Sequence, residues 1–211
     1  MKQYPPFTVT ATQISKSYDG FTSIFPPIDL SLTNGETLGI IGWNGSGKST
    51  LMKMLSGTLL PSTGSIIVHF DGSPLDNESL PQQIGFISPY LTVYEEFTPI
   101  EHAHMFCEMS GIRCNPELYE QLIVITGLKH YENRPIKAFS SGMKQRVKYL
   151  LGMIRQNPIL LLDEPSTNLD SKGQEIFKTI IQMHKTMGGG IIIATNDQAE
   201  TEFCDHIISL S

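Results

Sequence analysis

Two stretches of the sequence combine residue types that could bind phosphate together with a divalent cation. The first, GWNGSGKST at residues 42–50, follows the apolar run TLGII and precedes a pattern typical of a helix. In that context the spacing G-x-x-x-x-G-K-S predicts a phosphate-binding loop. Its glycines would let backbone amides close around a β-phosphate, Lys48 would neutralise the β and γ oxygens, and Ser49 would ligate magnesium.

The second stretch, ILLLDEP at residues 159–165, places two acids after a run of apolar residues. A buried strand would deliver both carboxylates to the carboxyl edge of a parallel sheet, where ligands bind. Asp163 would hold the magnesium ion, and Glu164 would orient or deprotonate the attacking water of a phosphoryl transfer. Two acids at a strand end are often only solvated, but the phosphate-binding loop favours the catalytic interpretation.

A third stretch, FSSGMKQR at residues 139–146, begins a predicted amphipathic helix with two serines and a glycine. Free backbone amides at a helix N-terminus form a pocket for a phosphate or a carboxylate. The alternative interpretation is structural, because Ser140 or Ser141 could simply cap the helix.

The elements that must position these motifs form an α/β pattern. Continuous apolar runs in TLGIIG, ILLLDEP and GIIIATND predict strands buried on both faces of a parallel sheet, whereas FTVTATQISKSY and IDLSLTNGE alternate like half-buried strands. KSTLMKMLSG and SKGQEIFKTIIQMHKTMG have helical spacing and predict crossover helices. From about residue 90 to 157, three helical patterns follow one another without a buried-strand run.

The predicted fold class is therefore an α/β P-loop NTPase core with a mostly parallel sheet, an N-terminal antiparallel β part and an inserted α-helical subdomain. We expect a single domain over residues 1–211, with the core at 1–89 and 158–211 and the helical subdomain at about 90–157. A chain of 211 residues with 40% apolar content can bury one good core of this kind.

Composition limits the partners. A net charge of -6 and a pI near 5.5, without clustered lysine and arginine, argue against a nucleic-acid binder. Cys107, Cys114 and Cys204 lack CxxC spacing and are expected to be reduced thiols. Nowhere do about 18 apolar residues follow one another, so we expect a cytosolic chain that reaches a membrane only through a partner.

The order GWNGSGKST, FSSGMKQR, ILLLDEP and TNLD resembles the nucleotide-binding domain of the ATP-binding cassette (ABC) family, from about Phe7 to the end. The resemblance implies an ABC transporter ATPase subunit, with ATP and Mg2+ as cofactors, on the cytoplasmic face of the inner membrane. It implies a dimer around MgATP, with a second copy or another ABC ATPase subunit, that drives a separate integral membrane transporter subunit. The stretch SSGMKQR favours an exporter, and no nucleic-acid partner is expected.

In this family the signature stretch caps the γ-phosphate that the partner domain holds, and the resemblance gives this role to FSSGMKQR. The Ser140 hydroxyl and the Gly142 N–H are the implied donors, with Phe139 in place of the more usual leucine. The anion at this helix start would thus belong to the other subunit.

Two more residues take roles that the resemblance implies. Tyr18 looks like the aromatic that stacks on adenine, with Phe21 and Phe25 as nearby rivals and core packing as the alternative. Asp170 looks like the loop aspartate that contacts the opposite subunit, although a helix cap would use the same residue.

Two positions depart from the family pattern. Ser88 and Pro89 stand where a glutamine is usual, so only the Ser88 hydroxyl or a backbone carbonyl could reach toward magnesium or the lytic water. Asn196 stands where a histidine usually senses the γ-phosphate, and its neutral amide predicts slow turnover. The departures leave open a second function, a nucleotide-gated regulatory dimerisation module with weak or no hydrolysis, whereas the intact Glu164 favours hydrolysis.

The candidate site residues fall into three groups by expected role. The catalytic pair is Glu164 and Asn196, and the magnesium ligands are Ser49, Asp163 and Ser88. The residues expected to bind the nucleotide are Tyr18, Gly42, Asn44, Gly45, Ser46, Gly47, Lys48, Ser49, Thr50, Ser140, Ser141 and Gly142.

Overall fold

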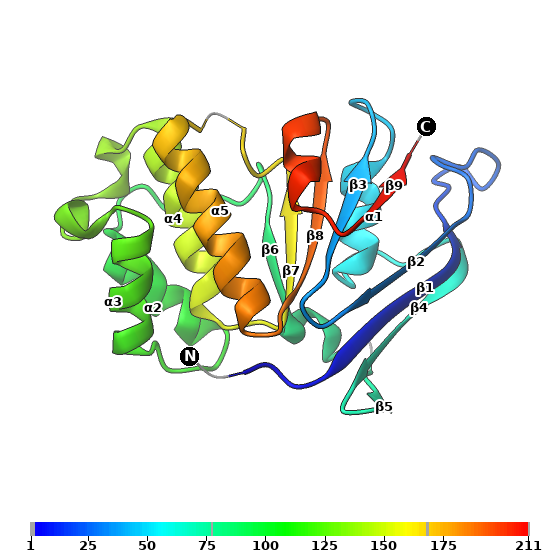
Figure 1. Ribbon diagram of the computed structural model, residues 1–211, viewed down its shortest axis with the longest axis horizontal. Coiled ribbons are helices and arrows are strands. Elements are labelled where there is room, and N and C mark those ends of the chain that lie inside the picture. Colours follow the sequence, from blue (N-terminus) through cyan, green and yellow to red (C-terminus); the bar gives the residue numbers. More distant parts are fainter. Residues whose placement is uncertain (1–2, 77, 168, 211) are drawn as a thin grey trace.

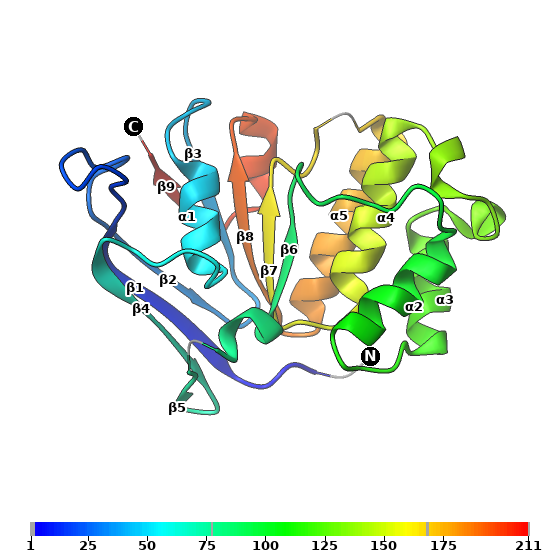
Figure 2. The same cartoon turned by 180° about the vertical axis from the view of Figure 1, so that it is seen from behind.

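The computed structural model describes residues 3–76, 78–167 and 169–210, and its strands form two sheets (Figure 1). One sheet is antiparallel, in the order β2-β1-β4-β5, and the other is parallel, in the order β6-β7-β8-β3-β9. Figures 1 and 2 place the antiparallel sheet at one end of the molecule and the helices α2, α3 and α4 at the other. The predicted fold class is confirmed.

The antiparallel sheet shows the alternation that its sequence predicts. In β1 the side chains of Phe7, Val9 and Ala11 are buried and the residues between them are exposed. The register shifts after Ala11, where Gln13 adopts a φ of 50°, and this irregularity bends the strand. The strands of this sheet are β1 (Phe7–Ser15), β2 (Ile28–Thr33), β4 (Thr63–Phe70) and β5 (Ser73–Pro74).

The parallel sheet forms the centre of the molecule, and every residue of β7 and β8 is buried. Because successive side chains of a strand point to opposite faces, Leu160 and Leu162 join the apolar cluster with α4 and α5, whereas Leu161 joins the cluster with α1. Both faces are therefore covered, which explains the continuous apolar runs. The strands are β3 (Thr37–Ile41), β6 (Ile84–Ile87), β7 (Ile159–Asp163), β8 (Gly190–Thr195) and β9 (His206–Ser209).

The helices connect the strands, and three of them follow one another between β6 and β7. The α-helices are α1 (Lys48–Leu55), α2 (Pro99–Met109), α3 (Pro116–Ile125), α4 (Ser141–Ile154) and α5 (Ser171–Thr186). Short 3-10 helices are η1 (Leu80–Gln83), η2 (Lys129–Tyr131), η3 (Ile136–Ala138) and η4 (Gln198–Phe203). Within the described residues, no helix is both long enough and apolar enough to cross a membrane.

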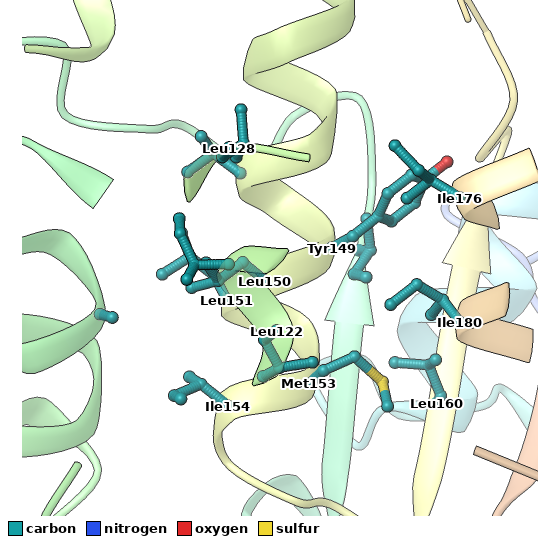
Figure 3. Packing of buried hydrophobic residues seen from close by; sticks show 14 of the residues in the cluster. Leu122, Leu128, Tyr149, Leu150, Leu151, Met153, Ile154, Leu160, Ile176 and Ile180 are labelled. Atoms are coloured by element: carbon teal, nitrogen blue, oxygen red, sulfur yellow. The ribbon is translucent and has the colours of Figure 1, made fainter. Parts of the chain in front are cut away.

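Helix α4 packs directly on β6 and on α5. Gly152 lies so close to β6 that an added Cβ would be 2.6 Å from Cγ1 of Ile87, which is itself fully buried. Figure 3 shows the neighbouring part of α4, where Tyr149 lies near Ile176 of α5 in a cluster that also includes Leu160 of β7. Close packing against β6 and α5 holds the helix against the parallel sheet.

The contact between α4 and β6 can be tested by overpacking. Gly152→Val should lower the free energy of unfolding by about 1–3 kcal/mol, because the added methyl groups must displace Ile87 in a closely packed core. Gln182→Val, on the exposed face of α5, is the matched control and should cost less than about 1 kcal/mol. Urea unfolding of both variants measures this. Equal losses of unfolding free energy in the two variants would contradict the close approach of Gly152 to Ile87.

Candidate functional site

The loop between β3 and α1 has a backbone that requires glycine. Gly45 and Gly47 adopt φ values of 92° and 99°, in the left-handed region that other residues avoid. A Cβ on Gly47 would lie 2.7 Å from Cδ1 of Phe25, and one on Gly42 would lie 2.7 Å from the Leu210 carbonyl oxygen. The loop therefore has the compact shape in which backbone amides can surround a phosphate.

A cleft of about 480 Å³ lies over this loop at the carboxyl edge of the parallel sheet. The loop and the start of α1 meet the end of β7 there, although more than a hundred residues separate β7 from them in sequence. The segment after β6 closes one side of the cleft. The lining residues are Ile24, Asn44, Gly45, Gly47, Lys48, Ser49, Thr50, Pro89, Tyr90, Asp163 and Glu164.

Lys48 is held over the loop by three acceptors. Its Nζ donates to the carbonyl oxygens of Gly42 at 2.8 Å and of Trp43 at 3.3 Å, and it lies 3.2 Å from Oε1 of Glu164. The Lys48 side chain is 6% exposed and that of Glu164 22%. A buried ammonium group needs such compensation. These contacts leave the positive charge at the floor of the cleft, where it could bind phosphate oxygens.

Ser49 and Asp163 form the second link between α1 and β7. The Ser49 hydroxyl donates to Oδ2 of Asp163 at 2.8 Å. Burial raises the pKa of Asp163, an effect that the hydrogen bond from Ser49 partly opposes. In the part of the chain that the structure describes, Oδ1 of Asp163 is buried without a hydrogen-bond partner. A hydroxyl beside an unpartnered carboxylate oxygen is the kind of oxygen donor set that suits Mg2+.

Glu164 has a strained backbone that other groups hold in place. Its φ of 49° lies in the left-handed region, which is uncommon for a residue with a side chain. The Glu164 N–H donates to the Ala194 carbonyl of β8 at 2.8 Å. The next carbonyl, that of Pro165, accepts from the Tyr149 hydroxyl at 2.6 Å and from Nε2 of Gln145 at 3.1 Å. The backbone that carries the Glu164 side chain is thus fixed by hydrogen bonds with both β8 and α4.

Asn196 follows β8 and contacts the phosphate-binding loop. Its Nδ2 donates to Oδ1 of Asn44 at 3.0 Å, and Asn44 lines the cleft. Asn196 itself lines a separate cavity of about 380 Å³ beside Trp43. The structure therefore joins Asn196 to the site through Asn44, and its expected role at the γ-phosphate stays a prediction.

The signature stretch lies outside the cleft of its own chain. Ser140 is the N-cap of α4, and its hydroxyl accepts from the Met143 N–H at 3.3 Å. Ser140 and Ser141 are exposed, whereas Gly142 is half-buried. Ser141 lines an adjoining cavity of about 520 Å³, which shares Pro89, Tyr90 and Glu164 with the cleft. The capping interpretation holds in the structure, and the role toward another subunit's phosphate stays a prediction.

The aromatic residues ahead of the loop have different environments. Tyr18 is 70% exposed, with Nζ of Lys16 5.6 Å from its ring centroid, and it does not line the cleft. Phe21 is exposed as well, but Phe25 is buried against Gly47 and belongs to the core. The structure thus removes Phe25 as a rival for adenine stacking.

Three other predicted residues do not line the cleft. Asp170 caps α5 by accepting from the Gly173 N–H at 2.7 Å, and it pairs with Arg146 of α4 at 2.9 Å. The Ser46 hydroxyl is buried beneath the loop, close to Gly42. Ser88 is half-buried beside the cleft, and its expected role as a magnesium ligand stays a prediction.

A family model described as "ABC transporter" matches residues 25–167, which is more than half of the chain. The matched segment contains the phosphate-binding loop, the signature stretch and the end of β7. This chain belongs to the ABC transporter family. The predicted family is confirmed, and with it the general assignment to the ATP-binding proteins of ABC transporters.

Known ABC proteins resemble the chain over most of its length. The lantibiotic transport ATP-binding protein SrtF of Streptococcus pyogenes is 33% identical over 189 residues, which cover 90% of this chain and 80% of SrtF. The ABC transporter ATP-binding protein NatA of Bacillus subtilis is 31% identical over 209 residues, which cover 96% of this chain and 85% of NatA. A third relative, YcbN of Bacillus subtilis, is 29% identical over 197 residues, and the chain spans 64% of its length.

Solved ABC structures have the same fold. The ATP-binding subunit of an ABC transporter matches with a TM-score of 0.82 and 26% identity over 95% of this chain and 85% of that chain. The protein cbiO1 from Clostridium perfringens, part of the ABC transporter complex cbiONQ, matches with a TM-score of 0.80 and 26% identity over 99% of this chain and 85% of that chain.

Some residues of this ABC site could not be found by motif. Ile24 and Tyr90 line the cleft although no pattern marks them. Glu200, in η4, is 3% exposed, and its Oε1 accepts from the Ser166 N–H at 2.9 Å, just after Glu164 and Pro165. Burial raises the pKa of Glu200. A single glutamate in a polar stretch gives no sequence signal for such a contact.

The phosphate-binding role of the ABC loop can be tested at Lys48. Lys48→Ala should abolish ATP binding or nearly so, because it removes the cation that three acceptors hold at the floor of the cleft. Lys53→Ala is the matched control, an exposed lysine of the same helix, and should bind ATP as the wild type does. Isothermal titration calorimetry measures both, and unchanged affinity of Lys48→Ala would contradict the assignment.

Proposed function

We propose that this chain is the ATP-hydrolysing subunit of an ABC transporter, which dimerises head to tail around MgATP and drives a separate membrane-spanning partner. The observation that carries the proposal is the double link between α1 and β7, in which Lys48 meets Glu164 and Ser49 meets Asp163. A cation for phosphate, oxygen donors for magnesium and a carboxylate for water thus share one cleft.

The residues of the cleft can each take one part of ATP hydrolysis. Ser49 and Asp163 would hold Mg2+, which when bound neutralises charge on the phosphate oxygens. Lys48 would exchange its loop carbonyls for the β and γ oxygens of ATP. Glu164 would accept a proton from water while the water oxygen forms its bond to the γ-phosphorus and the bond to the ADP oxygen breaks.

Dimerisation follows from the place of the signature stretch. Ser140 and Ser141 are exposed at the start of α4 but do not line the cleft of their own chain. Donors at an uncovered helix N-terminus can bind an anion supplied by another molecule. We propose that this anion is the γ-phosphate held by a second copy or by another ABC ATPase subunit.

The membrane partner belongs to the same proposal. We propose that residues of about 90–157 form a helical subdomain that contacts an integral membrane subunit on the cytoplasmic face of the inner membrane. The names of SrtF and NatA place those relatives in transporters. The stretch SSGMKQR favours an exporter, as in the sequence-based expectation.

A second candidate function is a regulatory dimerisation module that binds ATP but hydrolyses it poorly. The contact between Asn196 and Asn44 favours it, because the amide that would face the γ-phosphate already donates to the loop. Glu164 favours hydrolysis, because a regulatory site has little need for a carboxylate fixed at the end of β7.

Replacing the proposed general base separates the two functions. Glu164→Gln should keep ATP binding and lower phosphate release by about a hundredfold or more, because the amide preserves size but cannot accept the proton. The variant should accumulate as a dimer in MgATP and as a monomer in ADP, measured by gel filtration with light scattering. Phosphate release equal to that of the wild type would contradict the hydrolysis mechanism.

The role of Asn196 can be tested by restoring the more usual residue. Asn196→His should raise the rate of phosphate release by about tenfold, because a charge-assisted hydrogen bond to the γ-phosphate is stronger than a neutral one. Asn196→Ala is the companion variant and should be slower than the wild type. Turnover is best measured with the membrane partner present. If the wild type, Asn196→His and Asn196→Ala release phosphate at equal rates, Asn196 has no role at the γ-phosphate and only holds the end of β8.

A further inference from the structure

Lys148 makes a contact that the proposed function does not use. It is half-buried on α4, and its Nζ donates to the carbonyl oxygen of Ser88 at 3.2 Å and to that of Pro89 at 2.9 Å. Sixty residues separate the helix from these carbonyls, so the contact is tertiary. Burial lowers the pKa of Lys148, and the two carbonyls compensate part of the cost of burying its charge.

The segment that Lys148 holds is a wall of the nucleotide cleft. Pro89 and Tyr90 line the cleft, and they also line the adjoining cavity together with Lys148. The Ser88 carbonyl accepts a second hydrogen bond from the Leu91 N–H at 3.1 Å, which makes residues 88–91 a tight turn. Pro89 has no N–H, so its backbone can be fixed by a hydrogen bond only through its carbonyl oxygen, which Lys148 contacts.

The same helix also fixes the segment that follows Glu164, another residue that lines the cleft. Gln145 and Tyr149 both donate to the carbonyl oxygen of Pro165, directly after Glu164. Residues 145, 148 and 149 lie on adjacent turns of α4 and share one face. That face therefore binds backbone carbonyls of two segments, the one after β6 and the one after β7, while the N-terminus of the same helix carries Ser140.

We propose that Lys148 is a positioning residue that fixes residues 88–91 to α4, so that a displacement of this cleft wall by ATP is transmitted to Ser140 at the helix start. The proposal rests on the proposed function, because it assumes that ATP enters this cleft. Lys148 touches neither ATP nor water in this scheme. It acts through the carbonyl oxygens of Ser88 and Pro89.

A second contact between α4 and this segment does not depend on Lys148. Gly152 packs against Ile87, the last residue of β6, directly before the turn at residues 88–91. The helix therefore contacts this segment twice, by packing at Gly152 and by hydrogen bonds at Lys148. Loss of Lys148 would leave the packing in place and free only the turn.

Hydrogen exchange and steady-state kinetics together test the proposal on the full chain. Lys148→Met removes the charge and keeps a long side chain, Lys148→Arg keeps a cation, and Lys137→Met removes an exposed cation paired with Glu96 elsewhere in the helical segment. Exchange is followed in peptides covering residues 42–50, 86–93 and 139–146, with and without ATP and Mg2+.

In the wild type and in Lys137→Met, ATP with Mg2+ should slow exchange in all three peptides. In Lys148→Met, exchange at 86–93 should be faster without nucleotide, and the peptide at 139–146 should no longer respond to ATP. The kcat of this variant should fall by about tenfold, the equivalent of one charge-assisted hydrogen bond, with little change in KM. Lys148→Arg should restore most of the rate.

The outcomes separate this proposal from the function on which it rests. If the wild type shows no ATP response at residues 42–50, the proposed function is wrong, while exchange at 86–93 without nucleotide still tests the fixing of the turn. If Lys148→Met keeps the exchange pattern and the kcat of the wild type, Lys148 has no positioning role. Should Lys148→Met not fold, Lys148→Arg provides the test. The proposal requires that ATP slows exchange at residues 139–146 of this variant as it does in the wild type, and loss of that response would contradict the proposal.

Discussion

The ion pair between Lys48 and Glu164 is the interaction on which the rest of the site depends. It joins the loop after β3 to the end of β7, two strands that are separated in the sheet by β8. Lys48 is nearly inaccessible to water, and an ammonium group that is buried without partners is strongly destabilising. The parallel sheet must therefore hold both strand ends in register, and the hydrogen bond from Ser49 to Asp163 repeats the link one residue away.

Helix α4 is the second organising element. Its side chains reach two loops at the carboxyl edge of the sheet: Lys148 contacts the turn after β6, and Tyr149 and Arg146 contact Pro165 and Asp170 in the connection between β7 and α5. Its own core face packs against β6 and α5. A helix with these contacts ties the ends of β6 and β7 and the start of α5 together, so the cleft walls and the start of α4 form one connected unit.

The fold could be predicted largely because a parallel sheet that is covered on both faces demands continuous apolar runs. The runs TLGII and ILLLD mark β3 and β7 almost to the residue, and the glycines of the loop mark a backbone that only glycine adopts. The residues that we expect to bind phosphate could be found from the sequence for the same reason, since a local backbone shape leaves a local sequence pattern.

The contacts that depend on tertiary packing left no such pattern. Glu200 reaches Ser166 across 34 residues, and Lys148 reaches Ser88 across 60, so neither spacing has a local physical cause. Phe25 was an open rival for adenine stacking, and only its packing against Gly47 assigns it to the core. The expected roles of Ser88 and Asn196 stay predictions, because they depend on where a bound phosphate lies.

The central claim is that the loop at residues 42–50 closes around the phosphates of ATP, and the chain carries its own reporter for this event. Trp43 is the single tryptophan of the sequence, is 63% exposed, and its carbonyl oxygen accepts from Lys48. We expect titration with ATP and Mg2+ to produce a saturable change in tryptophan emission, which adenosine without phosphates does not produce and which withdrawal of Mg2+ weakens. An emission spectrum that stays constant while calorimetry records ATP binding would place the nucleotide elsewhere and contradict the account.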